Sequence, residues 1–434
     1  MGLIENYIDF LSNCKTERKC ITQIEKEARS KGFASIDEVK DLKAGDKVFV
    51  SKMGKSIALF VIGKKDIAEG MNILGAHLDS PRLDVKQNPV YEKEGIVYLN
   101  THYYGGIKKY QWVALPLAIH GVVCLVDGRK IDVNIGDEEG DPVFCVSDIL
   151  PHIAQEQMKK TAAEFIEGEK LDLVLGAYPE ENTGKDKIIA ILKDKYGIEE
   201  KDFASSELEV VPAGKARECG LDRSLILGYG QDDRVCGYTS LEAILDSKPA
   251  DRTLCCLLVD KEEIGSCGAT GMRSRFLDNA VADVVSHLSK DYSEYSVRKA
   301  LENSMMLSSD VNAAYDPLNS DLYDKQNSSF LGKGVVFNKY TGSRGKSGAS
   351  DANPEFIAKL RGQLDEHKVV YQNAEMAKVD VGGGGTIALY AAYYGMQVID
   401  CGVSVLSMHA PWEITSRFDI EQAYAAYKAF LLLK

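Results

Sequence analysis

The chain has 434 residues, of which 45% are hydrophobic and 27% are charged, a composition typical of soluble globular proteins. This length exceeds what one hydrophobic core usually organises, so we expect two domains, or one domain with a large insertion. The formal net charge of −13 argues against nucleic acid or an anionic membrane as a partner, because either would require a basic face.

The sequence shows no pattern of secretion or membrane insertion. The first 14 residues carry Glu5 and Asp9 and lack the basic start and apolar core of a secretory signal. No apolar run approaches the roughly 20 residues that span a bilayer. The ten cysteines form no CxxC motif and are expected to be reduced, mostly in the core. We therefore expect a cytoplasmic protein.

The expected elements fall into three segments in chain order. Residues 1–89 combine an N-terminal helical region with short strands, the last of which ends directly before His77. Residues 90–222 carry alternating strands and a charged stretch at 155–167 that is expected to be helical. This middle segment has no cluster of metal-ligand residue types, and we interpret it as an inserted, β-rich assembly domain.

Residues 223–434 alternate strands with helices. We expect strands at 253–259, 305–308, 335–337 and 396–405, and helices at 235–246, 268–275, 354–364 and 420–433. This alternation predicts a mixed, mostly parallel sheet with helices on both faces, an αβα sandwich. Together with residues 1–89, the segment is expected to form one α/β catalytic domain.

Four motifs place polar side chains directly after an expected apolar strand, where open α/β sheets bind ligands. The first contains His77 and Asp79. A histidine can bind a metal through one ring nitrogen while a nearby carboxylate accepts the other ring N–H and fixes the ring's orientation. Alone, this motif is more often a hydrogen-bonded turn than a metal site.

The second motif contains Asp232 and Asp233, after the apolar residues 225–227. A carboxylate can bridge two cations, with one oxygen on each. An aspartate before an apolar helix is also a common N-cap. We expect Asp233 to be that cap and Asp232 to serve the chemistry.

The third motif, Glu262 and Glu263, follows the buried strand expected at 253–259. Adjacent glutamates at the end of such a strand are costly unless a cation compensates their charge. Because adjacent side chains point in different directions, one can bind metal while the other acts as general base, then as general acid to the leaving amine. The residues alone leave open which glutamate has which role.

The fourth motif consists of Asp310 and His409, each placed after an expected strand. Singly, each fits a structural role. With the other motifs they supply two histidines and three carboxylates, a set suited to a pair of zinc or cobalt ions.

The order of these residues resembles the co-catalytic metallopeptidases with a phosphorylase-type α/β fold. Within them, residues 77–83 (His-Leu-Asp-Ser-Pro-Arg-Leu), 260–266 (Asp-Lys-Glu-Glu-Ile-Gly-Ser) and 404–410 (Ser-Val-Leu-Ser-Met-His-Ala) resemble the aspartyl aminopeptidase family, peptidase family M18. Residues 104–107 and 149–154 are similar to the insertion of that family, so the resemblance runs through the whole chain.

The sequence departs from the family pattern in two places. Residues 103–112 contain Lys-Lys-Tyr-Gln where a run rich in glycine and tryptophan is expected, and residues 231–233 are Gln-Asp-Asp in place of the usual Leu-Asp-Asn. Both departures leave the metal-ligand residues in place and bear on substrate preference.

The resemblance assigns roles to the motif residues. It implies two divalent ions, zinc first and cobalt or manganese as alternatives, with four terminal ligands: His77, Glu263, Asp310 and His409. It also implies that Asp232 bridges the ions, that Asp79 orients His77, and that Glu262 is the general base of amide hydrolysis.

The resemblance further implies removal of an N-terminal residue, often Asp or Glu, from peptides. An acidic substrate side chain needs a local cation, and we expect Arg344 or Lys346 to supply it, although a solvated basic loop is an equal alternative. Gly383 and Gly384 let the backbone approach a ligand and donate N–H groups.

The resemblance also implies a large homo-oligomer, typically a tetrahedral dodecamer, with residues 90–222 as the dimerisation or oligomerisation domain. His152 would reach the active site of a neighbouring subunit; a buried histidine at a helix start is the alternative. Two other functions stay open: an N-acyl amino-acid deacylase or carboxypeptidase with the same dinuclear site, and a self-assembling binding protein without catalysis.

Overall fold

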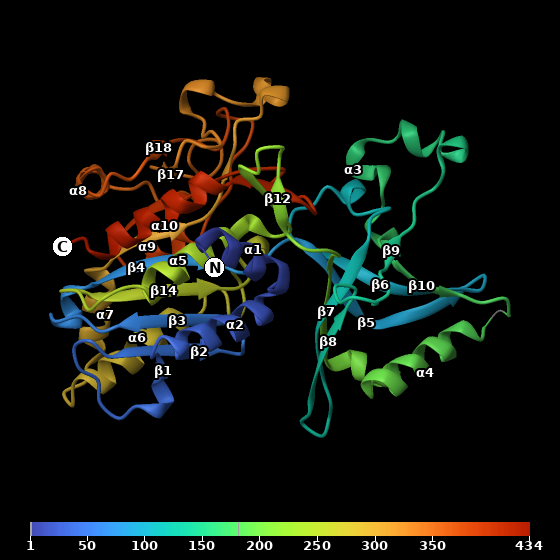
Figure 1. Cartoon of the computed structure of the whole chain (residues 1–434), viewed down its shortest axis with the longest axis horizontal. Helices are drawn as coiled ribbons and strands as arrows, with labels where there is room; N and C mark the ends of the chain where they lie inside the picture. The colour runs from blue at the N-terminus through green and yellow to red at the C-terminus, as the bar shows by residue number, and fades with distance from the viewer. Residues whose placement is uncertain (1, 181) are drawn as a thin grey trace. The chain divides into compact units, whose positions relative to one another are not determined.

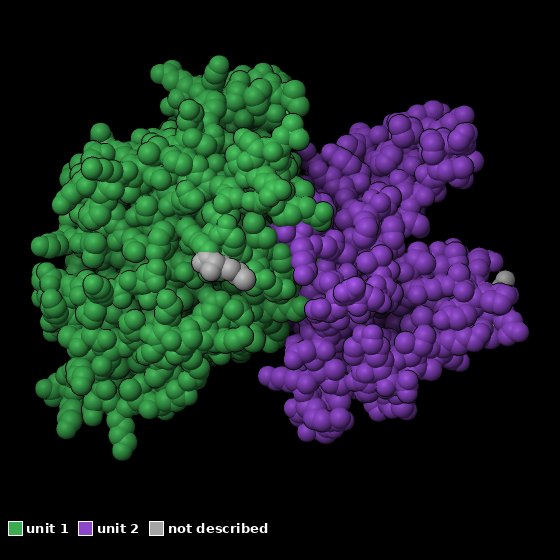
Figure 2. All heavy atoms as spheres, viewed as in Figure 1, with its two compact units in different colours: residues 1–79, 217–408, 413–434 green, residues 80–216, 409–412 purple. Residues whose placement is uncertain are grey.

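The computed structural model describes residues 2–180 and 182–434, which form two compact units (Figure 2). Of these described residues, unit 1 contains 2–79, 217–408 and 413–434, and unit 2 contains 80–180, 182–216 and 409–412. A middle segment is therefore inserted into unit 1, and a short piece near the C-terminus returns to unit 2. The expected functional domains, residues 1–89 with 223–434 and residues 90–222, stay a prediction.

Unit 1 is built on a large mixed sheet (Figure 1). In the described chain, its strands run in the order β1 (Ala34–Ser35), β2 (Lys47–Lys52), β3 (Ser56–Val61), β14 (Thr253–Val259), β4 (Met71–His77), β15 (Met305–Ser309), β19 (Gln397–Gly402), β17 (Val335–Asn338) and β18 (Tyr371–Asn373). The central strands β14, β4, β15 and β19 are parallel, whereas β3 and β17 pair antiparallel with them on either side. The predicted α/β class with a mixed sheet is confirmed.

Most helices belong to unit 1: α1 (Leu3–Asn13), α2 (Glu17–Ser30), α5 (Gln231–Leu245), α6 (Phe276–Leu288), α7 (Glu294–Glu302), α8 (Pro354–Glu366), α9 (Ala388–Ala392) and α10 (Arg417–Leu431). Ile73 of β4 packs in a buried apolar core with α6, α7 and α9. Asn72, which precedes Ile73 in β4, points to the other face of the sheet. Its Nδ2 donates to carbonyl oxygens at and just after the end of α10, with a distance of 2.7 Å to the oxygen of Leu433. Helices therefore pack against both faces of β4.

Unit 1 also contains a smaller sheet, several of whose strands directly precede or follow motif residues along the chain. Its strands run in the order β12 (Arg217–Cys219), β13 (Leu225–Gly228), β21 (Glu413–Ser416), β20 (Ser404–Leu406) and β16 (Asn312–Ala313). The strand expected at 396–405 is therefore two strands, β19 and β20, in different sheets. The helix expected at 268–275 is wrong, because these residues form turns and α6 begins at Phe276.

Unit 2 is mostly antiparallel. Its sheet runs in the order β8 (Lys130–Ile135), β7 (Leu117–Cys124), β11 (Ser206–Pro212), β5 (Arg82–Lys93), β6 (Ile96–Tyr104), β10 (Leu173–Ala177) and β9 (Cys145–Val146), and its helices are α3 (Ala162–Phe165) and α4 (Gly184–Tyr196). The helix expected at 155–167 is wrong. Lys160 has an extended backbone that separates a short 3₁₀ turn from α3, and the charged stretch carries little apolar surface to bury.

None of the helices in the described residues is long and apolar enough to cross a membrane.

Candidate metal centre

Three neighbouring parallel strands of unit 1 end at the same edge of the large sheet. The order β14–β4–β15 places the short 3₁₀ turn that carries Glu262 and Glu263, the last residue of β4 and Asp310 side by side. Val259 pairs with His77, so β14 and β4 finish level with each other. The polar side chains that follow these strands meet because parallel strands present their carboxyl ends together.

His77 lies at the centre of this group and is 1% exposed. Its Nε2 is 3.3 Å from Oδ1 of Asp232, 3.8 Å from Oδ1 of Asp310 and 3.9 Å from Oε2 of Glu262. Burial lowers the pKa of the His77 ring, but hydrogen bonds with Asp232, Asp310 and Asp79 outweigh it and raise the pKa well above its ordinary value. One imidazole nitrogen therefore faces several carboxylates.

Asp79 connects the histidine to the glutamate pair. Its carboxylate oxygens accept the backbone N–H groups of Glu262 at 3.1 Å and Glu263 at 3.2 Å. Its backbone carbonyl is 3.0 Å from Nδ1 of His77, and its Oδ1 is 3.4 Å from the same nitrogen. Asp79 thus lies where it can fix the ring tautomer and the backbone of the glutamates.

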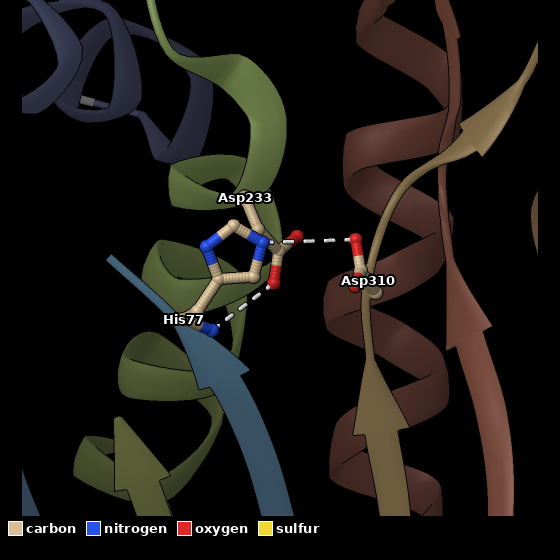
Figure 3. A group of neighbouring side chains, drawn as sticks. All are labelled: His77, Asp233 and Asp310. Atoms are coloured by element: carbon tan, nitrogen blue, oxygen red, sulfur yellow. Dashed lines mark hydrogen bonds and ion pairs between the residues drawn. The ribbon is translucent and has the colours of Figure 1, made fainter. Parts of the chain in front are cut away.

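Asp232 and Asp233 enter the group from the start of α5, which packs against β4 and β14. Glu413 of β21 accepts the backbone N–H of Asp232 at 3.1 Å. The backbone of Asp232 and Asp233 is non-helical, so the regular part of α5 begins after Asp233, and the expectation that Asp233 caps this helix stays a prediction. Asp233 also accepts the backbone N–H of His77 at 3.4 Å (Figure 3).

The residues of this edge fit a divalent cation. His77, Asp232 and Glu263, and separately His77, Asp233 and Asp310, each offer ligand atoms that lie within 4.8 Å of one another. Burial, with neighbouring carboxylates, raises the pKa of Glu262 to about 8 and that of Asp233 well above its ordinary value. Buried carboxylates crowded in this way are stabilised by a cation, and oxygen and imidazole donors suit zinc.

Comparison with known proteins identifies the chain. The family profile described as "Aminopeptidase I zinc metalloprotease (M18)" matches residues 10–431. The chain belongs to the M18 family. It is 56% identical to the probable M18 family aminopeptidase 1 of Clostridium acetobutylicum, over 99% of this chain and 94% of that one. It superimposes on the crystal structure of the Thermotoga maritima M18 aminopeptidase with a TM-score of 0.96 and 42% identity, covering 99% and 96% of the two chains.

Family membership establishes the class of activity. The protein is a metallo-aminopeptidase of the M18 family, a hydrolase that acts on peptide bonds. Neither the deacylase or carboxypeptidase function nor the non-catalytic scaffold is favoured by these relatives. More distant structures, such as the mApe1 dodecamer of Saccharomyces cerevisiae with 19% identity and a TM-score of 0.79, share the fold.

Four of the residues expected to bind substrate line one pocket of the M18 chain. Arg344, Lys346, Gly383 and Gly384 line one cavity of about 120 Å³ in unit 1. The backbone N–H of Gly342 donates to the carbonyl of Gly384 at 2.7 Å and so joins the two loops. The two loops, which are separate in sequence, therefore line one small polar pocket.

His409 and His152 belong to unit 2. Nδ1 of His409 is 2.9 Å from the carbonyl oxygen of Gly106 in the same unit, and His409 has a positive φ of 64°. His152 is exposed in a short 3₁₀ turn (Pro151–Ile153), so the alternative of a buried histidine at a helix start is wrong.

Two further residues of the edge were not predicted from sequence as part of it. Glu413 carries no motif, and only its place in a buried strand distinguishes it from other glutamates. For Asp233 the sequence indicates a helix cap and not a place beside His77. The signal that could have found it is the pair of adjacent aspartates, because two acidic residues before an apolar helix supply one more carboxylate than a cap needs.

Proposed function

We propose that this M18 aminopeptidase removes N-terminal acidic residues from peptides with two divalent metal ions, zinc first and cobalt or manganese as alternatives. The observation that carries the proposal is the meeting of His77, Asp232, Glu263 and Asp310 at one edge of the sheet. Asp232 is proposed as the bridging ligand and the other three as terminal ligands. His409 is proposed as the fourth terminal ligand on the family resemblance.

Bound at these residues, two divalent ions would supply Lewis acidity to the scissile amide and counter the charge that develops on its oxygen. Glu262 is proposed as the general base, which takes a proton from the attacking water and passes it to the leaving amine. The backbone hydrogen bond from Glu262 to Asp79 holds the base in place. The same carboxylate holds Glu263, so base and ligand are positioned together.

The small polar pocket is proposed to bind the acidic side chain of the substrate. Lys346 is partly occupied, because its Nζ is 3.5 Å from Asp351 and lies 3.7 Å from the centre of the Tyr340 ring. Arg344 makes no ion pair among the described residues of the chain. Arg344 is therefore the stronger candidate to pair with a substrate carboxylate, and the N–H groups of Gly383 and Gly384 would add donors.

Assembly and location complete the proposal. The Saccharomyces cerevisiae relative is described as a dodecamer, and we propose that this chain also forms a homo-oligomer, with residues 90–222 as the dimerisation domain and His152 directed to a neighbouring subunit. The αβα sandwich of phosphorylase type and the cytoplasmic location stay predictions from the sequence.

A substrate panel tests the proposal. Chromogenic amides of Asp, Glu, Leu and Lys are assayed with zinc, cobalt or manganese, with and without a chelator. We expect the Asp and Glu amides to be hydrolysed fastest, the chelator to abolish hydrolysis, and N-acetylated substrates to be resistant.

Metal content by mass spectrometry is the companion measurement, with two ions per chain expected. Absence of hydrolysis of every free-amine substrate would contradict the proposal. Hydrolysis that persists without metal would reject the metal-dependent mechanism, and equal rates for Asp and Leu amides would reject only the acidic preference.

A further inference from the structure

Asp233 is a completely buried carboxylate next to the proposed bridging residue. One of its oxygens, Oδ2, accepts the backbone N–H of His77 at 3.4 Å. The other, Oδ1, is buried and has no hydrogen-bond partner among the residues that the structure describes. A buried carboxylate oxygen without a partner is costly, so this position calls for a compensating positive group.

Nearby cations of the protein do not supply that group. Arg234, the next residue, is fully buried, but its guanidinium donates to the carbonyl oxygen of Lys15 at 2.9 Å and lies over the ring of Tyr229. The thiol of Cys236 approaches the carboxylate and carries no positive charge. The ring of His77 faces Asp233 and can supply part of the compensating charge, and a bound ion would supply the rest.

Asp233 faces the residues that would hold such an ion. The ligand atoms of His77, Asp233 and Asp310 lie within 4.8 Å of one another, and all three side chains point into the same space (Figure 3). His77 comes from the end of β4, Asp233 from the start of α5 and Asp310 from the end of β15. The group of possible metal ligands thus combines two residues from strand ends with one carboxylate from the start of a helix.

We propose that Asp233 is a positioning residue of the metal centre, which holds the backbone of His77 and tightens divalent-ion binding on the side formed by His77 and Asp310. This inference rests on the metal centre proposed above. The usual amide at this position of the family can hold a backbone group but brings no charge. The aspartate of this chain therefore adds one negative charge to the site without an additional terminal ligand.

The test is metal binding by the full-length enzyme after removal of its metal with a chelator. Isothermal titration with zinc alone is compared for the unmodified protein, for Asp233→Asn and for the control Asp419→Asn. Asp419 is a buried aspartate of α10 that accepts the N–H groups of Gly332 and Gly334, and it belongs to neither metal group. Both substitutions remove one buried negative charge with little change of shape.

We expect Asp233→Asn to weaken binding of one of the two ions by roughly 10- to 100-fold, as is usual when a residue that orients a metal ligand is changed. Asp419→Asn is expected to leave both dissociation constants within a factor of about two, because the carboxylate of Asp419 binds Gly332 and Gly334 and no proposed ligand. Excess cobalt should restore the activity of Asp233→Asn. Unchanged affinity for both ions in Asp233→Asn, or equal weakening in the control, would overturn the inference.

A second measurement uses the unmodified enzyme and therefore tests the inference even if Asp233→Asn does not fold. In a zinc-loaded crystal of the unmodified enzyme, anomalous scattering locates the ions, and Oδ1 of Asp233 is expected to reach one of them through one bound water. An Asp233 carboxylate that reaches no ion would overturn the inference. Two ions bound with Asp233 uninvolved would leave the proposed function intact, whereas an unmodified enzyme that binds no zinc would contradict both.

Discussion

Two regions of unit 1 carry the proposed chemistry, and they are built in opposite ways. The metal edge, the sheet edge where His77, Asp232, Glu263 and Asp310 meet, is formed at the ends of buried parallel strands. There His77 and Asp79 are at most 1% exposed and both are hydrogen-bonded. The small polar pocket is formed by two loops. Arg344 and Lys346, in one of them, are exposed and have positive φ angles. Rigid strands suit groups whose spacing decides the reaction, whereas loops suit contacts that decide only which substrate enters.

The prediction with the largest expected effect removes the proposed general base, Glu262, and keeps the metal-ligand residues. Glu262→Gln preserves shape and the backbone hydrogen bond to Asp79 but cannot accept a proton. We expect kcat to fall by roughly 10²- to 10⁴-fold, the usual contribution of a positioned general base. Metal content should stay at the level of the unmodified enzyme.

Glu421→Gln serves as the control for this prediction, since Glu421 is exposed on α10. Its activity should not change. Loss of bound metal in Glu262→Gln would show that Glu262 is a ligand, and retained activity would remove it from the mechanism.

The second prediction concerns the connection between the strands. Asp79→Ala removes the acceptor of two backbone N–H groups and a carboxylate beside the ring of His77. We expect metal affinity and kcat/KM to fall together by roughly 10- to 100-fold. Asp79→Asn keeps one carbonyl oxygen as an acceptor, so its metal affinity and kcat/KM should lie between those of the unmodified enzyme and of Asp79→Ala.

Chelator competition and steady-state kinetics measure these two quantities. If Asp79→Ala lowered kcat/KM while metal affinity stayed constant, Asp79 would act on the base alone and not on His77.

The strand edge was largely predictable from sequence, and the reason is physical. Parallel strands end on the same side, so His77, Glu263 and Asp310 had to meet once β4, β14 and β15 were neighbours. The order of strands is a long-range property, and the pattern of apolar residues does not contain it. Chain order and the family resemblance supplied what local pattern could not.

The helix side of the centre was less predictable. Asp232 reaches the edge from α5 while the strand before it, β13, lies in a different sheet, and Glu413 arrives from a distant part of the chain. The sequence indicates a helix cap at Asp233, but it does not show that the carboxylate also turns toward the backbone of His77 at this irregular helix start. Tertiary placement decided each of these residues.

The third prediction tests the loop side. Arg344→Met should raise KM for an Asp amide by about tenfold and leave the Leu amide nearly unchanged, because a charged hydrogen bond to the substrate is lost. Lys346→Met should have a smaller effect, since Lys346 already pairs with Asp351. Lys339→Met is the control: Lys339 also pairs with Asp351, and it does not line the pocket.

Equal effects of Arg344→Met on Asp and Leu amides would remove the pocket from specificity. The loop would then be a solvated basic surface, the alternative that its sequence left open.

The smallest predicted effect is on stability and concerns Glu242, which lies in α5, the helix whose first residues include Asp232 and Asp233. Burial, with Glu27 and Asp246 nearby, raises the pKa of Glu242 to about 7. Glu242 belongs to no metal group in the described chain, so a metal ion is not expected to compensate it. In the unfolded chain its pKa is the ordinary 4.5, so the folded state binds the proton more tightly.

Stability should therefore fall as the pH rises from about 4.5 to about 7 and then level off. Glu242→Gln removes this loss and should be more stable than the unmodified protein at pH 8, by on the order of 1 kcal/mol after solvent screening, with little difference at pH 5. Denaturant unfolding at the two pH values measures it, and Glu366→Gln, at an exposed position of α8, controls for the change of charge. A gain that depended on added zinc would place Glu242 in the metal-linked part of the helix, because only a group coupled to the ion could respond to it.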